Sequence, residues 1–487
     1  DSRSKDLRYS QLIKNFDAYT YPKKLVPLRS SESGDSDAST SQKQAFCIAL
    51  RSGTTYKLFA LGRQSAVNRA EILMKDIGVG ASATDFDDAG WDTPANNQAG
   101  QATPSYNLFV YYKKTELVYG AHTGTHIFAF DPTSSAVFAD THRAITYTNI
   151  AQGLVHSKDD ILYVPYDNKI AKNDNGTWTD AALTLPIHFY ITSICEYGNY
   201  IIIACAPVSG YGNSKIFLWD RDATLATLSE SVDWGEGTLQ ILEEVNGRLI
   251  GISYLNGLLT SPDYKVIFRE YVGGKARIFK QFISTSQVNM PIAKQKVNNE
   301  FYWLMDLTIE GERQQGLWKI NGDLAIVFDR TANNDTAIET GTSTLKGFIA
   351  VRDCVFISYL TAASAFALSK TNDTATYAYT SYYDTLIFNA GDSSIKKKLI
   401  GATVMTEPLA SGQSVVLAYK INEETSFTTI LTHSTANAIS KSAVNIESSG
   451  ANLPEFKEIV FRIESTGNAE ITGIEYRYEV IPKDIYD

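Results

Sequence analysis

The sequence predicts an all-β protein, a β-propeller followed by a C-terminal antiparallel β-sandwich. Three observations favour this fold class. Short runs rich in β-branched and aromatic residues recur at regular spacing, and turn residues bound each run. The chain contains 28 Tyr and 22 Phe but only 4 Met, a balance typical of strands. Near residue 380 the regular spacing ends and the strand-like runs become longer.

The composition limits the class of protein. The chain has 487 residues, 44% hydrophobic and 20% charged, which is too long for one ordinary domain unless it is a repeat array. Its net charge of −10 argues against direct nucleic-acid binding, which needs a basic surface. No apolar run reaches the length of about 18 residues that a membrane span needs. The N-terminus, DSRSKDLRYS, lacks an apolar core, so no signal peptide is visible; because the chain starts at Asp1 and not at Met, a leader or propeptide that has already been removed is the alternative.

Residues 1–42 are predicted to form an extended N-terminal arm and a linker of irregular structure. The apolar side chains of Leu12, Ile13 and Phe16 suit an arm that docks on another surface. Ser30–Ser41, with the sequence SSESGDSDASTS, is low in complexity and is typical of a solvated linker.

The clearest repeat unit spans residues 191–231. Its short apolar runs are separated by turns at Gly198-Asn199 and Asp220–Ala223, as in a four-stranded antiparallel sheet. The predicted strands are Ile191–Cys195, Tyr200–Ala206, Lys215–Trp219 and Thr224–Ser231.

Seven such units fill residues 43–380. Their first turns begin at residues 52, 113, 158, 198, 246, 298 and 352, so six intervals span 300 residues and average 50. A small four-stranded sheet cannot bury both of its faces alone, and a closed ring of sheets buries both. The ring has seven blades, or six if the first unit belongs to the arm. An open stack of sheets or two sandwiches is the alternative architecture.

Residues 381–487 are predicted to form the β-sandwich. Ile459, Phe461 and Ile463 alternate with polar residues, as one buried sheet face requires. The predicted strands include Tyr382–Phe388, Leu399–Thr406, Ser414–Ile421, Phe427–Thr432, Glu458–Glu464 and Ile471–Val480.

Three groups of residues are candidate sites. Asp174–Trp178 (DNGTW) resembles the end of an Asp-box turn, and a structural hairpin turn is the prediction. His122 and His126 could ligate zinc only with further ligands, for which His142 and His156 are the nearby candidates. The acids are better explained as hydrated surface residues than as a calcium site, because no Asp-x-Asp-x-Asp-Gly loop is present; they are Asp220, Asp222, Asp233 and Glu236. No metal and no cofactor are therefore predicted.

The four cysteines are predicted to be mainly buried free thiols. Cys195 and Cys205 lie on successive predicted strands of one unit, which leaves a disulfide between them as the alternative. Cys47 and Cys354 are far from these two in sequence, and the spacing matches no metal-binding pattern.

A group of tyrosines marks the predicted junction of ring and sandwich. The residues are Tyr377, Tyr379, Tyr382 and Tyr383. Alternate residues of a strand share a face, so this patch predicts an interdomain packing seam. The functional alternative is a stacking platform for a sugar ring.

Several stretches carry a resemblance to a known family. They are ILYVPYDNKIAKNDNGTWTDAALTLP (161–186), KIFLWDRDATLATLSESVDWGEG (215–237), RTANNDTA (330–337), ALSKTND (367–373) and KKKLIGATVMTEPLASGQSVVLAYKIN (396–422). In these turn and strand patterns the chain resembles propeller-plus-sandwich structural proteins of tailed-bacteriophage virions. The resemblance implies a component of the tail, nozzle or fibre-attachment region, present as a ring or trimer, with no catalytic residues.

The leading hypothesis is therefore a non-enzymatic virion structural protein of a tailed phage or phage-like particle, located in the tail region. Its expected partners are tail, portal or fibre subunits, further copies of itself and a host-surface glycan. The alternative is a secreted, extracellular propeller that binds or hydrolyses glycans and carries a sugar-binding sandwich. Glycoside hydrolysis stays open because its two carboxylates can come from distant strands. A third hypothesis is a cellular propeller for protein–protein interaction.

Overall fold

The computed structural model describes most of the chain and consists of two compact units. The described residues are 10–17, 24–28, 31–33, 45–52, 55–64, 69–76, 104–122, 124–133, 139–208, 212–222, 230–257, 264–297, 299–309, 311–322, 324–332, 344–351, 354–360, 366–371, 381–422, 424–444 and 454–481. One unit comprises residues 31–323 and 335–373, and the other comprises 1–30, 324–334 and 374–487. No helix in the described ranges is long and apolar enough to cross a membrane.

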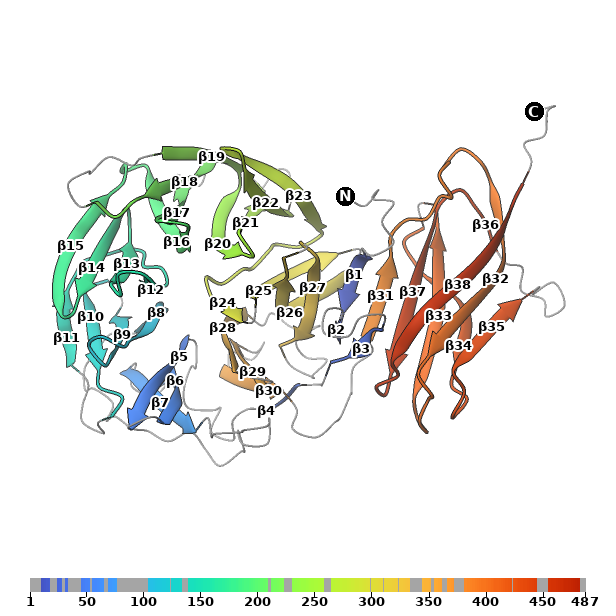
Figure 1. The fold of residues 1–487 in the computed structure, drawn as a ribbon, viewed down its shortest axis with the longest axis horizontal. Helices are drawn as coiled ribbons and strands as arrows, with labels where there is room; N and C mark the ends of the chain where they lie inside the picture. The colour runs from blue at the N-terminus through green and yellow to red at the C-terminus, as the bar shows by residue number, and fades with distance from the viewer. Residues whose placement is uncertain are drawn as a thin grey trace. The chain divides into compact units, whose positions relative to one another are not determined.

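The larger unit is a β-propeller of seven sheets, which follow one another around a ring in chain order (Figure 1). The first three sheets are β5–β7 (Ala45–Ser52, Thr55–Gln64, Arg69–Asp76), β8–β11 (Pro104–Tyr112, Leu117–His122, His126–Phe130, Ala139–Ala144) and β12–β15 (Leu154–Val155, Leu162–Tyr166, Lys169–Asp174, Thr177–Thr184). Every pair of neighbouring strands within these sheets is antiparallel.

The fourth and fifth sheets are β16–β19 (Phe189–Tyr197, Tyr200–Pro207, Asn213–Trp219, Glu230–Glu236) and β20–β23 (Thr238–Val245, Arg248–Asn256, Tyr264–Val272, Lys275–Ser284). The sixth contains β24 (Lys294–Val297), β25 (Glu300–Ile309) and β26 (Glu312–Ile320), and the seventh contains β28 (Thr344–Val351), β29 (Cys354–Leu360) and β30 (Phe366–Thr371). Below, the sheets are called blades 1 to 7. The first strand of each blade lies nearest the centre of the ring (Figure 1).

The chain closes the ring with its N-terminal part. The short strand β4 (Ser31–Ser33) pairs with β30 and becomes the outer strand of blade 7. On the inner side, β5 of blade 1 contacts both β8 of blade 2 and β28 of blade 7. Pairing of the first and last segments leaves no open end to the array, because each blade then has a neighbour on both faces.

The repeat spacing predicted the blades well. Each of the seven predicted first turns begins where the first strand of a blade ends and before its second strand, although residues 298 and 352 themselves lie outside the described ranges. One strand was wrong: the fourth strand of blade 4 is Glu230–Glu236, not Thr224–Ser231. Val232 and Trp234 of that strand are buried, so their alternation sets its register. Residues 223–229 lie outside the described ranges.

Large side chains pack between the blades. Trp219 of blade 4 meets Tyr163 of blade 3 edge to face, with ring centres 5.6 Å apart. Trp234 of blade 4 packs over Gly251 of blade 5, where an added Cβ would lie 2.5 Å from the indole. Each blade therefore buries aromatic surface against its neighbour, which is what a ring of small sheets needs for stability.

The smaller unit is a β-sandwich built around one apolar core. One sheet has the order β27 (Ile326–Thr331), β1 (Ser10–Lys14), β31 (Ser381–Thr385), β37 (Ile459–Thr466), β33 (Ser414–Ile421) and β34 (Thr428–His433). In the other, β32 (Lys397–Thr406) pairs with β35 (Ser440–Val444), β36 (Glu455–Phe456) and β38 (Ile471–Val480). The core side chains include Leu399, Val404, Leu417, Phe461 and Ile463.

The N-terminal segment is part of this sandwich, which corrects the predicted irregular arm. Strand β1 lies between β27, to which it is parallel, and β31, to which it is antiparallel. Ile13 and Phe16 bury their side chains in the sandwich core. A second short pair, β2 (Phe16–Asp17) with β3 (Val26–Pro27), follows. The expected docking of apolar residues thus occurs within the same chain, where it removes apolar surface from water.

Candidate functional site: the central pocket of the propeller

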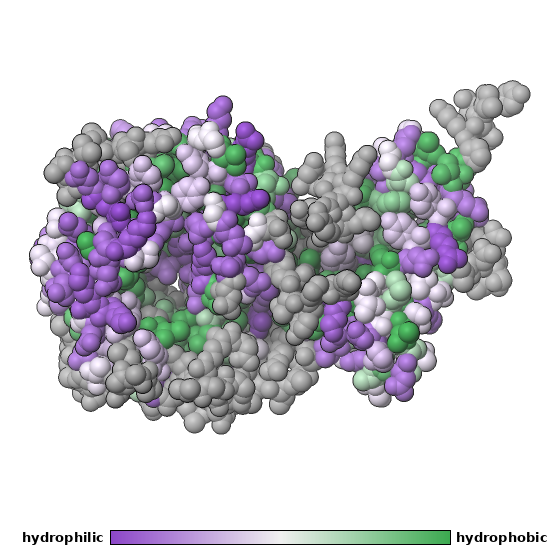
Figure 2. Space-filling model, in the orientation of Figure 1, coloured by the Kyte–Doolittle hydropathy of each residue, from purple (hydrophilic) through white to green (hydrophobic). Residues whose placement is uncertain are grey.

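A pocket lies at the centre of the propeller, against its innermost strands. It has a volume of about 320 Å³ and is lined from β5, β8, β24, β28 and the residues just before β12 and β24. The space-filling view shows a hollow at the centre of the ring with a mainly hydrophilic rim and hydrophobic residues on its wall (Figure 2). Five of the seven blades contribute to it, namely blades 1, 2, 3, 6 and 7.

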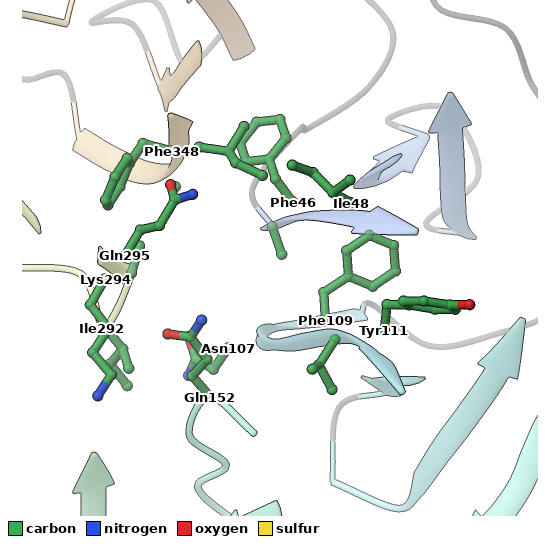
Figure 3. Close-up of a pocket in the computed structure, with 15 residues that line it drawn as sticks. Phe46, Ile48, Asn107, Phe109, Tyr111, Gln152, Ile292, Lys294, Gln295 and Phe348 are labelled. Carbon is green, nitrogen blue, oxygen red and sulfur yellow. The ribbon is translucent and has the colours of Figure 1, made fainter. Parts of the chain in front are cut away.

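The pocket wall is apolar and polar in nearly equal parts. Its aromatic and large aliphatic residues are Phe46, Ile48, Phe109, Val110, Tyr111, Ile292, Phe348 and Ile349. The polar residues among the described lining are Asn107, Gln152, Lys294 and Gln295. The close-up shows the carboxamides of Asn107 and Gln152 close together on one side, with Gln295 and Lys294 opposite (Figure 3).

Lys294 is the one charged residue in this lining, and its charge is already satisfied. Its ammonium donates to the carbonyl oxygens of Ile194 at 2.8 Å and Leu242 at 2.7 Å. It also pairs with the carboxylate of Glu243 at 2.9 Å. The side chain is only 9% exposed. Lys294 therefore ties blade 6 to the inner strands of blades 4 and 5 and brings no free charge to the pocket.

Gln295 is likewise committed to the fold. Its amide group donates to the carbonyl oxygen of Ala350 at 2.9 Å, and its oxygen accepts from the Ala350 amide at 2.7 Å. This two-way contact mimics a strand pair and joins blade 6 to blade 7.

Gln152 differs from both, because its Oε1 atom is buried and finds no hydrogen-bond partner in the described part of the chain. The Tyr111 hydroxyl is also buried without a partner there, but it points away from the other labelled side chains (Figure 3). A buried acceptor without a donor is uncommon in folded proteins. Gln152 thus offers the pocket an unused acceptor.

The predicted tyrosine patch is not an exposed stacking platform. Tyr382 is 5% exposed, and the guanidinium of Arg462 lies 4.2 Å from its ring centre. Tyr383 is half-buried against the sandwich core, and this burial raises the pKa of its hydroxyl. Adjacent strand residues point to opposite faces, and here each face is covered. Tyr377 and Tyr379 lie outside the described residues.

The histidines do not converge into a metal site. No group of three or more His, Cys, Asp or Glu that could hold a metal is found within the described ranges. His142 packs against Tyr119, with ring centres 5.6 Å apart. His156 is 1% exposed and lies between Arg221 and Asp159, at 3.1 Å from the Asp159 carboxylate. His122 and His126 begin and end the loop between β9 and β10.

The acids and the Asp-box-like segment have structural roles. Asp233 accepts hydrogen bonds from Asn213 and from the Gly235 amide, and Asp220 accepts from the Asp222 amide. Asn175 and Gly176, both at positive φ, turn the β14–β15 hairpin, as predicted.

The thiols of Cys195 and Cys205 are free and buried, so the alternative of a disulfide between them is wrong, and Cys354 is buried as well. Cys205 pairs with Ile191 in register, not with Cys195, and the two thiols belong to different core clusters.

Sequence reasoning missed the pocket because its residues come from remote blades. Asn107, Gln152 and Gln295 are separated by dozens of residues in the chain. The one local signal was the polar sequence of the first strand of blade 6, Lys294–Val297 (KQKV), which has a single apolar residue.

No protein-family model matches the chain, and no curated protein is similar to it in sequence. Several solved structures are similar in fold. A glycoside hydrolase matches 92% of this chain with 100% of its own length, at 10% identity and a TM-score of 0.29. A protein from Lactobacillus plantarum matches 67% of this chain with 95% of its own, at 10% identity and a TM-score of 0.40. The propeller domain of the Trilobed protease from Pyrococcus furiosus matches 68% with 96% of its own, at 10% identity and a TM-score of 0.36. At such identities and TM-scores these likenesses carry no functional argument.

Proposed function

We propose that this protein is a non-enzymatic structural component of a tailed-phage or phage-like particle, where the propeller acts as a rigid scaffold and attachment module. The proposal combines the resemblance of its turn and strand patterns to virion structural proteins with a feature of the ring. That feature, which carries the proposal, is a chain of polar contacts between neighbouring blades.

The contacts extend from blade 2 to blade 7. Between blades 2 and 3, the guanidinium of Arg143 donates two hydrogen bonds to the carboxylate of Asp180. Between blades 3 and 4, the hydroxyl of Ser157 donates a hydrogen bond to the carboxylate of Glu196. Thr192 donates to the Leu239 carbonyl between blades 4 and 5. The Lys294 and Gln295 contacts described above join blade 6 to blades 4, 5 and 7.

Each of these contacts alone stabilises the folded ring by about 1 kcal/mol, and the exposed ones by less. Together with the aromatic packing between blades they oppose sliding of one blade on the next. A rigid ring that presents many loops on one face suits a subunit that must hold its neighbours in fixed geometry. The partners of this role are other tail, portal or fibre subunits and copies of the same chain.

The chemistry of the central pocket is consistent with binding and not with acid–base work. Among its described lining residues there is no carboxylate, its single lysine is paired with Glu243, and the Tyr111 hydroxyl points away from the other labelled side chains (Figure 3). General acid–base catalysis needs a titratable group within reach of the substrate.

The test is to purify particles from the source and measure this chain in them by quantitative mass spectrometry. Labelling of intact particles with an antibody to the chain, viewed by electron microscopy, gives its position. The expected result is a constant copy number per particle and label confined to the tail region. Loss of the chain on purification, with the protein recovered free, contradicts the proposal, and a screen for glycan binding and hydrolysis then tests the alternative.

A further inference from the structure

The central pocket contains a hydrogen-bond acceptor that the fold leaves unused. Gln152 Oε1 is buried and has no partner within the described residues. Two other polar side chains nearby are occupied, because Lys294 binds two carbonyls and Glu243, and Gln295 binds the backbone of Ala350. The Asn107 carboxamide lies beside Gln152 in the same pocket (Figure 3). Burying an acceptor without a donor is unfavourable, so a ligand that supplies the donor gains from it.

The rest of the wall selects against charge. Phe46, Phe109, Ile292 and Phe348 present hydrocarbon surface to the pocket (Figure 3). An ionised ligand would lose its hydration against this wall and would find no opposite charge free to compensate. A neutral apolar group loses little hydration and buries its surface.

We propose that the pocket binds a neutral, mainly apolar group that carries one O–H or N–H donor, and that this donor bonds to Gln152 Oε1. The volume of about 320 Å³ is at the small end of ligand sites, which suits a group the size of one aromatic ring. This inference goes beyond the scaffold role and does not depend on the chain being part of a particle.

The experiment uses the full chain and three probes that share one ring. Toluene is apolar without a donor, p-cresol adds a hydroxyl donor, and p-toluate adds a negative charge. Ligand-observed NMR gives the affinity of each. We expect p-cresol to bind about five-fold more tightly than toluene, the ratio typical of one hydrogen bond, and p-toluate not to bind.

Two variants and one control assign the binding to this pocket. Gln152→Leu keeps the side-chain size but removes the acceptor, so p-cresol and toluene should bind equally. Gln281→Leu makes the same change at an exposed position on β23 and should leave the ratio at about five. Ala293→Phe places a ring in the pocket and should abolish binding of both probes, which tests the site even if Gln152→Leu does not fold.

A fourth probe, N-acetyltyrosinamide, distinguishes the two sources of such a group. If it binds as well as p-cresol, the pocket accepts a side chain from a peptide segment; if only p-cresol binds, the pocket takes a free small molecule. The inference is overturned if no probe binds, if p-toluate binds as well as p-cresol, or if Gln152→Leu leaves the p-cresol to toluene ratio unchanged.

Discussion

Arg462 and Asp384 face each other across the sandwich sheet and form a two-pronged ion pair. They are register partners on β37 and β31, and Arg462 donates from Nε to Oδ1 at 2.7 Å and from Nη2 to Oδ2 at 2.8 Å. The guanidinium also lies 4.2 Å from the ring centre of Tyr382 and 4.0 Å from that of Phe427. A planar cation held between two rings and a carboxylate fixes the pairing of these two strands.

Replacing Arg462 with lysine should therefore destabilise this sheet although the charge is kept. An ammonium group cannot make two parallel hydrogen bonds to the carboxylate or stack on both rings. We therefore expect the free energy of unfolding to fall by about 2 kcal/mol. Hydrogen–deuterium exchange of peptides from β31 and β37 in the full chain measures it locally. The matched control is Arg477→Lys, because the Arg477 side chain is 64% exposed. Equal exchange rates in the Arg462→Lys and Arg477→Lys variants would show that the two hydrogen bonds between Arg462 and Asp384 do not stabilise the sheet.

Lys294→Met should weaken the centre of the propeller. The substitution leaves two carbonyls and the Glu243 carboxylate without their donor, and we expect a loss of about 3 kcal/mol. Lys296→Met is the control on the same strand, since the more exposed Lys296–Glu244 pair should contribute about 0.5 kcal/mol. Urea unfolding of the full chain compares them. Similar midpoints for both variants would argue against Lys294 as a tie between blades.

Gly251→Ala should disturb the seam between blades 4 and 5. The new methyl would meet the Trp234 indole at 2.5 Å, so the ring must shift, at a cost of about 2 kcal/mol. The variant Trp234→Phe makes room, and in the double variant the two losses should be less than additive. Thermal unfolding of the unchanged protein, the two single variants and the double variant gives the coupling free energy between the two positions. Simple additivity would mean that the indole does not sit over Gly251.

Cys195 and Cys205 should be unreactive in the folded protein. Burial raises the pKa of both thiols well above the ordinary value, so they stay protonated at mildly alkaline pH. Iodoacetamide at pH about 8.5, followed by peptide mass spectrometry, should label them only after unfolding. Ile187→Cys, at a position 78% exposed, provides a reactive control thiol. Native-state labelling at the control's rate would contradict the burial.

The same thiols give the stability a pH dependence with a defined sign. The unfolded chain loses their protons as the pH rises above about 8.5, whereas the folded chain retains them. Folding stability should therefore fall as the pH rises through this range. The double variant Cys195→Ala/Cys205→Ala lacks these groups, and its unfolding midpoint, although lower, should depend less on pH.

Much of the propeller could be predicted from the sequence. In the tight hairpins where turns were predicted, Gly198, Asn246 and Gly247 adopt positive φ. The strands around them, for example Tyr200–Pro207, are apolar over nearly their whole length because both sheet faces are covered. These are local patterns, and local patterns are visible in a sequence.

The candidate sites were harder to predict because burial decides what a side chain can do. Tyr382 has an aromatic ring of the kind that stacks on sugars. The guanidinium of Arg462, which lies 80 positions later in the chain, covers this ring. The position of the fourth strand of blade 4 depended on Val232 and Trp234 packing inside, which the turn spacing alone did not indicate.

The sequence by itself determined the all-β class, the spacing of the blades and most of their hairpins, because strand period and turn chemistry act between neighbouring residues. Only the tertiary structure decided that Ile13 and Phe16 belong to the sandwich core and that β4 closes the ring. It alone brought Gln152 and Lys294 to one pocket. Such contacts join residues far apart in the chain, and their energy depends on the burial that the whole fold creates.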